Sequence, residues 1–408
     1  MQKFEAVRVI EALRSGISSR HLSAIFSYGR EGLLEKIQRD LDAVAGDESL
    51  RAMVLKGDYG EGKTHLLNVV FNRAQEQNFA VSFVVLSKET PFGRLDRVYP
   101  KVVAGTYLPG EVEPGIEALL RDVRPGSAIA DEILTFARHE LHSKVFRVLE
   151  NYFEAGDTQD LHDLAGDLAG QWLPVDQLKA VHKRNFGRSA KIERFRPKLD
   201  VWNYFRLLAY LIKRRGCAGW VILFDEFELV GTLGIAARAD AYSNLGRFLF
   251  PEEADSLVST YVVFSVASRF WPDVLLRSRR PDIDEVPRRL VAKGEPHRAD
   301  LVRRVLNTLL QDAVALETLP AGEVRRMLAA VQDFHANAYG WEPKADLDAI
   351  LEATRHARLR TKIRYALEYL DLKYLYGEEP LLLAETPGEP ALDEAAATGD
   401  AAANVKTL

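Results

Sequence analysis

Residues 57–64, Gly-Asp-Tyr-Gly-Glu-Gly-Lys-Thr, are the stretch with the clearest chemistry. They fit the pattern G-x-x-x-x-G-K-[ST] at every fixed position, after a short apolar run and before a helical pattern. Glycines in such a loop let several backbone N–H groups face one phosphate, and the following helix adds its positive end. We expect Lys63 to reach the β- and γ-phosphates of a nucleotide and Thr64 to ligate Mg²⁺. The predicted nucleotide-binding residues are Gly57, Asp58, Tyr59, Gly60, Glu61, Gly62, Lys63 and Thr64.

A second motif lies far downstream, where the apolar run Trp220–Phe224 ends in Asp225 and Glu226. Such a run is typical of a strand buried in a parallel sheet, so its carboxyl end would emerge beside the phosphate loop. Asp225 would hold Mg²⁺, directly or through water, and Glu226 would orient and deprotonate an attacking water. The alternative is a strand that ends in two solvated acids. Together with the loop, the pair predicts an ATPase.

A third candidate comes from residues 261–268, which are predicted to form another strand. A polar residue at its end would lie between the phosphate loop and Asp225. Ser268 or Ser265 would then bond the γ-phosphate or its attacking water, whereas a hydroxyl that merely caps the strand end is nearly as good an explanation.

The elements that must position these residues form an α/β pattern with a parallel sheet. Strands are expected at residues 52–55, 80–86, 220–224 and 261–268. The second and third are separated by a large insertion that carries helical patterns and no convincing strand. After Pro296 the pattern is again helical. We expect a helical segment at 1–46, an ATPase core at 47–290 with the insertion at about 88–200, a C-terminal helical lid at 291–376 and a disordered acidic tail at 377–408.

The last helix of the lid carries three arginines, Arg358, Arg360 and Arg364. An arginine that reaches back to the nucleotide would couple the γ-phosphate to the angle between domains. A solvated basic face explains the same residues equally well.

Composition narrows the class of protein. The 408 residues carry a net charge of −5, so the whole chain is not a binder of polyanions. The single cysteine, Cys217, excludes a disulfide framework, and no apolar run approaches the length of a membrane span. These features predict a soluble, cytoplasmic protein without membrane partners.

One stretch, residues 183–198, is rich in basic side chains with two phenylalanines between them. Basic groups would neutralise phosphates and aromatic rings would stack on bases, so DNA is a candidate partner. A mobile solvated loop or a protein-docking face are the alternatives. The predicted contacts are Lys183, Arg184, Arg188, Lys191, Arg194 and Arg196. A second cluster is a candidate source of an arginine acting in trans on a neighbouring subunit: Arg277, Arg279, Arg280, Arg288 and Arg289.

The chain resembles the ATP-binding proteins of BREX phage-defence systems (BrxD-like), and more distantly the AAA+/STAND and origin-recognition ATPases. The resemblance covers residues 4 to about 375 and rests on segments 10–16, 57–66, 86–91, 219–228 and 338–341. It implies that Gly29-Arg30-Glu31 places Arg30 beside the adenine and that His65 belongs to the nucleotide site. Where the family's fourth strand ends Ala-Gly-Thr-Pro, this chain has Val266-Ala267-Ser268-Arg269, so Ser268 would replace the threonine. Arg360 matches the family's lid arginine.

This resemblance implies an ATP-binding, ATP-hydrolysing defence component with an AAA+-like core, ATP and Mg²⁺ as cofactors, and either copies of itself or other defence proteins as partners. We expect it to act on or beside DNA, with the ATP state controlling assembly. The alternative is an ATP-dependent switch or scaffold with little turnover that docks a partner protein. A small-molecule kinase is less favoured, because no acceptor site is evident. The intact Glu226 favours hydrolysis over a pure switch.

Overall fold

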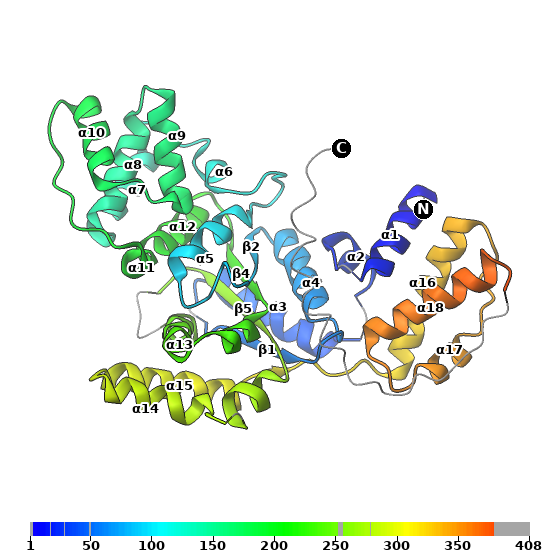
Figure 1. Ribbon diagram of the computed structural model, residues 1–408. Coiled ribbons are helices and arrows are strands. Elements are labelled where there is room, and N and C mark those ends of the chain that lie inside the picture. Colours follow the sequence, from blue (N-terminus) through cyan, green and yellow to red (C-terminus); the bar gives the residue numbers. More distant parts are fainter. Residues whose placement is uncertain are drawn as a thin grey trace. The chain divides into compact units, whose positions relative to one another are not determined.

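The computed structural model describes residues 3–378, apart from residues 17, 28, 49, 252–255 and 278. The chain forms two compact units (Figure 1). The larger unit spans residues 18–319, and the smaller combines residues 1–17 with the segment from Pro320 onward. Residues 379–408, which make up nearly all of the expected acidic tail, lie outside the described part of the chain.

A six-stranded sheet forms the centre of the larger unit, in the order β3-β2-β4-β5-β1-β6. The four predicted strands are present as β1 (Met53–Gly57), β2 (Phe79–Val85), β4 (Gly219–Asp225) and β5 (Thr260–Ala267), and they run parallel. Two short edge strands were not predicted. β3 (Thr106–Tyr107) pairs antiparallel with β2, and β6 (Val314–Ala315) pairs parallel with β1.

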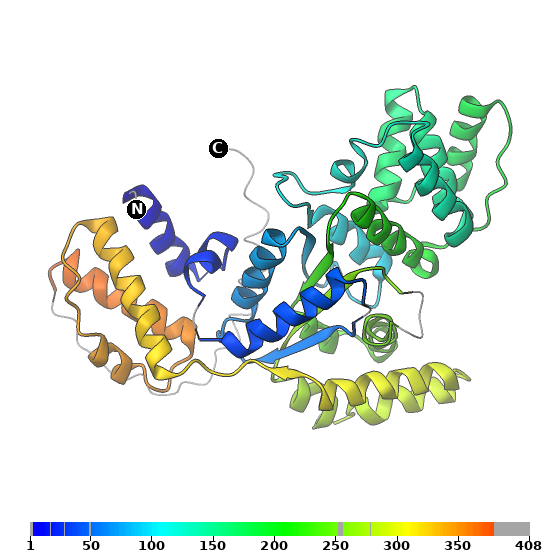
Figure 2. The same cartoon turned by 180° about the vertical axis from the view of Figure 1, so that it is seen from behind.

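Apolar side chains on both faces explain why the central strands are buried. Every residue of β4 and β5 is buried, as expected for parallel strands covered on both sides. On one face, α3 (Glu31–Ala45) and α4 (Lys63–Glu76) pack against Leu55, Val221 and Val263. On the other face, α5 (Leu95–Ala104), α12 (Trp202–Arg214) and α13 (Ile235–Leu249) pack against alternate strand residues such as Ile222 and Phe264. Figure 2 shows α3 lying across the strands.

The segment between β2 and β4 is almost entirely helical. Its helices beyond α5 are α6 (Ile116–Leu120), α7 (Ala128–Glu140), α8 (Ser143–Glu154), α9 (Thr158–Gly166), α10 (Val175–Phe186), α11 (Pro197–Asp200) and α12, with a π-helical turn at Asp167–Gln171. The helical pattern of residues 128–153 is divided between α7 and α8, because the chain breaks at Leu141 and His142. Leu141 is extended, and the His142 ring accepts a hydrogen bond from the Lys144 N–H that begins α8.

The segment after β5 differs from the expected lid. η3 (Trp271–Leu276), α14 (Asp282–Ala292) and α15 (Pro296–Gln311) belong to the larger unit. Their apolar residues, such as Val286 and Val302, join the same core as Leu245 of α13. The expected boundary at 290/291 therefore falls inside the larger unit, and the division lies at Pro320. Periodicity predicts these helices, but it does not reveal which neighbour each apolar face covers.

The smaller unit contains α1 (Lys3–Ser15), α16 (Ala321–Tyr339), α17 (Leu347–Ala353) and α18 (Leu359–Tyr374). Polar contacts join α1 to these C-terminal helices. Arg14 donates to Asp371 over 3.2 Å through its Nε, and His335 lies 2.8 Å from the same carboxylate. The expected N-terminal segment 1–46 is thus divided, because α2 (Arg20–Ile25) and α3 belong to the larger unit. None of the described helices combines the length and apolar character required to cross a bilayer.

Candidate functional site

The loop between β1 and α4 has the backbone geometry of a phosphate-binding turn. Gly60 and Gly62 have φ values of 78° and 88°, a region in which side chains with a Cβ are strained. Gly62 immediately precedes α4, so the first N–H groups of that helix face the loop. A Cβ at Gly57 would lie 3.2 Å from Cγ of Lys63, so this glycine leaves room for the lysine.

Lys63 lies folded over this loop. Its side chain is almost fully buried, and its Nζ donates to the Asp58 carbonyl over 3.2 Å. The same ammonium lies 4.9 Å from the centre of the Tyr59 ring. The positive charge is therefore held among loop residues, at the place where anionic phosphates would enter.

The two motifs meet at Thr64 and Asp225. The Thr64 hydroxyl donates to the buried Asp225 carboxylate over 2.6 Å. A hydroxyl and a carboxylate oxygen at this separation fit Mg²⁺, which takes oxygen ligands and is usually bound through one or two protein groups plus phosphates. Among the described residues there is no cluster of three or more His, Cys, Asp or Glu side chains suited to a metal. Thr64 and Asp225 are residues that could hold a nucleotide-bound metal ion.

Glu226 follows directly and has an unusual backbone. Its φ of 63° and ψ of 35° are left-handed, a strained conformation for a residue other than glycine. Its N–H donates to Asp225 Oδ1 over 3.0 Å. Burial, followed by the nearby charges of Glu228 and Asp225, raises the pKa of Glu226 to about 7. A carboxylate with a pKa near 7 is suited to accept a proton at neutral pH.

Two residues of this site were not predicted from the sequence. Glu228 is buried beside Glu226 and, with burial, raises the pKa of the Tyr59 hydroxyl. Arg269 places its guanidinium 4.8 Å from the centre of the Tyr59 ring, on the ring that also borders Lys63. The only sign of these two residues in the sequence was their closeness to predicted site residues. Glu228 lies two residues after the Asp-Glu pair, and Arg269 directly follows Ser268.

Ser268 lies at the expected edge of the sheet. β5 runs between β1 and β4, as predicted, and the Ser268 N–H donates to the carbonyl of Gly57 over 3.0 Å. Ser265 is different, because it lies inside β5 opposite Leu55 and is fully buried. The strand end therefore brings Ser268, rather than Ser265, next to the phosphate loop.

Arg30 and His65 flank the loop from the side of α2 and α3. Arg30 Nη2 donates to the carbonyl of Glu61 over 2.5 Å, and burial lowers the pKa of this arginine to about 10. The His65 ring contacts the Phe26 carbonyl, and burial lowers the His65 pKa. Arg30 thus supports the phosphate loop directly.

Arg360 belongs to the other unit. It lies in the first turn of α18, and its Nη2 donates to the Gly16 carbonyl at the end of α1 over 2.6 Å. The structure thus gives this arginine a partner inside the smaller unit.

The basic stretch 183–198 has two kinds of residue. Lys183, Arg188, Lys191, Arg194 and Arg196 are exposed. Arg184 forms an ion pair with Asp160, with Nε 3.1 Å from Oδ2.

The expected stacking aromatics of this stretch are engaged elsewhere. Phe195 packs against Trp172 and Tyr204, and Phe186 lies against His182. These contacts hold both half-buried rings within the helical segment, so the stacking of the rings on bases stays a prediction.

The arginine cluster after β5 is also divided. Arg288 and Arg289 both pair with Glu285. Arg277, Arg279 and Arg280 are exposed, and no ion pair is found for them within the described residues.

The chain was compared with known protein families and with solved structures. A family model described as BREX system ATP-binding protein BrxC/D matches residues 1–122 and 117–365. Among solved structures, the Walker-type ATPase PABY2304 of Pyrococcus abyssi is similar over 82% of this chain and 67% of its own, with 13% identity and a TM-score of 0.34. The curated proteins contain no match. The family match spans most of the chain, whereas the structural likeness is too weak to support an argument.

Proposed function

Because the chain belongs to the family of BREX system ATP-binding proteins BrxC/D, we propose that it hydrolyses the ATP it binds and works as an ATPase of a phage-defence system. The observation that carries this proposal is the contact of Thr64 with Asp225, with Glu226 as the next residue. The Thr64 hydroxyl, the Asp225 carboxylate as candidate metal ligand and Glu226 as candidate base therefore lie at the same edge of the sheet. A protein that only stored a nucleotide would not need the third group.

The roles of the residues follow from their positions. Backbone N–H groups of residues 60–64 and the Lys63 ammonium would hold the β- and γ-phosphates. Thr64 and Asp225 would hold Mg²⁺, which supplies charge neutralisation at the phosphates when bound. Glu226 would orient a water and accept its proton, while Ser268 would donate a hydrogen bond to the γ-phosphate or to that water.

Arg269 is a further candidate for this site. Arg269 directly follows Ser268 in the chain, and its exposed guanidinium lies over the Tyr59 ring of the phosphate loop. A guanidinium suits the oxygens of a phosphoryl group, to which it can offer two N–H groups at once. We assign it to the stabilisation of charge on the γ-phosphate.

The proposal extends to the cycle in which the protein uses ATP. An AAA+/STAND-like cycle would use α16–α18 as a lid, with Arg360 reporting the γ-phosphate, and would couple the ATP state to assembly with further copies or with other proteins of the system. Arg277, Arg279 or Arg280 would then be the trans-acting arginine, since these three carry no ion pair among the described residues. Action on or beside DNA belongs to the same proposal.

A second candidate function, an ATP-dependent switch with little turnover, is favoured by one observation. Burial, followed by the negative charges of Glu228 and Asp225, raises the pKa of Glu226 to about 7, so half of the molecules would hold this carboxyl protonated at neutral pH. A protonated Glu226 cannot accept a proton from water. Turnover would then be slow, and the bound ATP would act mainly as a signal for a docked partner.

Two measurements test the proposal. Calorimetry of Lys63→Ala should show ATP affinity reduced by about ten- to a hundredfold, since a hydrogen bond to a charged group is worth about 1.5–3 kcal/mol. Lys101→Ala, on the exposed face of α5, is the matched control. Single-turnover hydrolysis with and without duplex DNA then separates the candidates. Unchanged ATP affinity in Lys63→Ala would overturn the nucleotide site, and absent hydrolysis under all conditions would leave the switch.

A further inference from the structure

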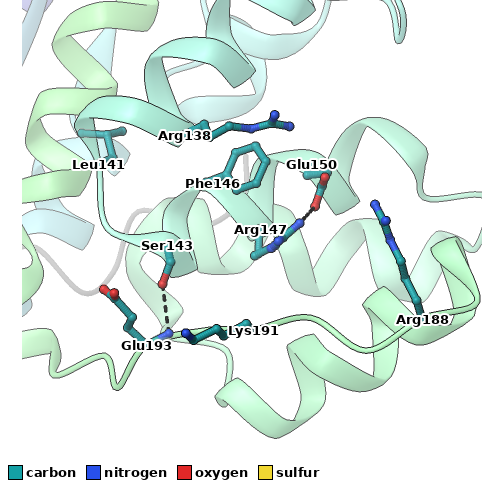
Figure 3. A pocket seen from close by; sticks show the side chains of 9 residues that line it. All are labelled: Arg138, Leu141, Ser143, Phe146, Arg147, Glu150, Arg188, Lys191 and Glu193. Atoms are coloured by element: carbon teal, nitrogen blue, oxygen red, sulfur yellow. Dashed lines mark hydrogen bonds and ion pairs between the residues drawn. The ribbon is translucent and has the colours of Figure 1, made fainter.

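A hollow of about 520 Å³ lies in the helical segment between β2 and β4 (Figure 3). Its walls come from the end of α7, the first half of α8, and the loop that follows α10. Four cationic side chains line it, namely Arg138, Arg147, Arg188 and Lys191. Only Arg188 and Lys191 lie in the basic stretch 183–198, so the sequence pattern indicated two of these four cations. The fold adds Arg138 and Arg147, which lie 50 and 41 positions before Arg188 in the chain.

Within the described residues, three of these cations form no ion pair with a carboxylate. Arg147 is paired with Glu150 over 2.5 Å, and the second acid of the hollow, Glu193, lies near His142 at 4.0 Å. Arg138, Arg188 and Lys191 are exposed, and the described part of the chain offers them no ion pair. Like charges that converge without a partner repel one another, so the arrangement favours an anionic ligand.

Phe146 keeps two of the arginines in place. Its ring is almost fully buried, with the guanidinium of Arg138 at 4.8 Å and that of Arg147 at 4.9 Å from its centre. A cation held against an aromatic ring loses less freedom when it binds a ligand. The arginine side of the hollow is therefore preorganised, while Arg188 and Lys191 come from the loop opposite.

We propose that this hollow binds backbone phosphates of a nucleic-acid strand, through Arg138, Arg188 and Lys191. Guanidinium groups match phosphate oxygens with paired N–H groups, and Lys191 adds a point charge. Further exposed cations lie outside the hollow, Lys183 in the last turn of α10 and Arg194 in the loop after it, and they suit a ligand longer than a single phosphate. Because Phe186 at the end of α10 lies against His182 and Phe195 in the loop packs against Trp172, recognition would involve the backbone and would not depend on sequence. The site deepens the DNA part of the proposed function, and it does not depend on ATP hydrolysis.

The test compares a triple variant of the full chain with a matched control. Arg138→Gln, Arg188→Gln and Lys191→Gln together remove the unpaired cations and break no ion pair. Arg97→Gln, Lys101→Gln and Arg124→Gln remove two arginines and one lysine that are equally exposed, without ion pairs among the described residues, and outside the hollow. Affinity is measured by fluorescence anisotropy for short mixed-sequence DNA, single-stranded and duplex, over a series of salt concentrations.

We expect the triple variant to bind DNA roughly tenfold more weakly or worse, with the slope of log affinity against log salt smaller by about 2 to 3, since each phosphate contact contributes about 0.7 to 0.9. The control variant should retain the wild-type slope within about one contact. A variant with Arg138→Lys and Arg188→Lys keeps the charge and should keep the slope. ATP affinity and melting temperature should be unchanged in all three, which separates this site from the phosphate loop.

Several results would overturn the proposal. One is wild-type protein with no affinity for DNA at low salt. Another is equal loss in the triple and control variants, which would make binding a matter of general charge. If polyglutamate competes as strongly as unlabelled DNA, the hollow does not recognise phosphate groups specifically, and an acidic protein partner is indicated. Pyrophosphate binding that depends on Arg138 and Arg188, without DNA binding, would replace the nucleic acid by a free phosphate compound.

Discussion

Thr64 and Asp225 are 161 positions apart in the chain, yet the hydroxyl of one donates to the carboxylate of the other over 2.6 Å. The contact exists because β1 and β4 run parallel on either side of β5, so the loops after them emerge at the same edge of the sheet. This hydrogen bond brings the phosphate loop and the Asp225-Glu226 pair together within the protein itself.

This contact leads to the first prediction, which concerns the metal. Thr64→Ala removes one oxygen that we assign to Mg²⁺ and should weaken binding of Mg·ATP by about ten- to a hundredfold. Binding of ATP in the presence of a chelator should change much less. Titration calorimetry with Mg²⁺ and with EDTA measures both. Thr64→Ser keeps the hydroxyl and serves as the control, and equal losses with and without Mg²⁺ would show that Thr64 acts on the phosphates alone.

The second prediction concerns the base. Glu226→Gln keeps the size of the side chain and removes its ability to accept a proton, so ATP should bind normally while hydrolysis slows by about 10²- to 10⁴-fold. Single-turnover assays with excess enzyme measure the chemical step separately from product release. Glu228→Gln is the neighbouring control, and it should not slow hydrolysis at neutral pH, because it leaves the Glu226 carboxylate in place. Wild-type rates in Glu226→Gln would move the base to another residue.

The third prediction follows from the pKa of Glu226. Because the deprotonated carboxylate is the active form, single-turnover rates should rise as the pH increases through about 7. Removing the negative charge in Glu228→Gln lowers the pKa of Glu226, so the midpoint of the profile should move to lower pH. A profile that is flat from pH 6 to pH 8 would contradict this assignment (roughly one pH unit on either side of the pKa).

The same pKa has a consequence for stability. A folded-state pKa raised above the value of 4.5 means that the folded protein binds more protons than the unfolded chain between pH 4.5 and 7. The stabilisation that protonated Glu226 contributes is complete below pH 4.5 and is lost as the pH rises through about 7. Glu226→Gln should therefore melt higher than wild type above this window, and the difference should shrink below it.

The site was more predictable from the sequence than the architecture around it. The phosphate loop and the Asp225-Glu226 pair are short patterns on buried strands, and parallel topology places their ends together. Ser268 followed from the same rule. The sequence did not reveal the contact of Arg269 with the Tyr59 ring, because that ring belongs to a different loop.

The missed structural elements have equally specific causes. β3 and β6 are two residues long, too short for a period of two to be visible. The break between α7 and α8 depends on a cap at His142 and on the side chain of Asn203, which accepts the His142 N–H over 2.9 Å. Phe195 gave an aromatic signal for stacking, but its partners Trp172 and Tyr204 come from other elements, the end of the π-helical turn and α12.

The fourth prediction tests the core of the helical segment. Lys144 and Asp167 form a buried ion pair, and the Tyr204 hydroxyl and the Leu173 N–H also donate to this carboxylate. Asp167→Ala leaves the Lys144 charge buried without its partner, so the free energy of unfolding should fall by about 3–5 kcal/mol. Glu132→Ala breaks the exposed pair with Arg214 and should cost at most about 1 kcal/mol. Urea unfolding measures both changes, and equal small losses would mean that the buried site readjusts.

The last prediction distinguishes two roles of Arg360, one in hydrolysis and one in the stability of the smaller unit. As a lid arginine it would stabilise charge on the γ-phosphate, and Arg360→Ala should then lower hydrolysis by about 10³-fold or more while ATP still binds. Its contact with the Gly16 carbonyl, by contrast, predicts only a loss of stability in the smaller unit.

Arg14→Ala separates these outcomes, because it breaks the ion pair with Asp371 in the same unit without removing the proposed catalytic charge. We expect both variants to melt at lower temperature and only Arg360→Ala to lose hydrolysis, measured well below the melting transition. If Arg360→Ala hydrolyses ATP at the wild-type rate, the arginine serves to join α18 to α1, and the γ-phosphate must be read by Arg269 or by an arginine from another subunit.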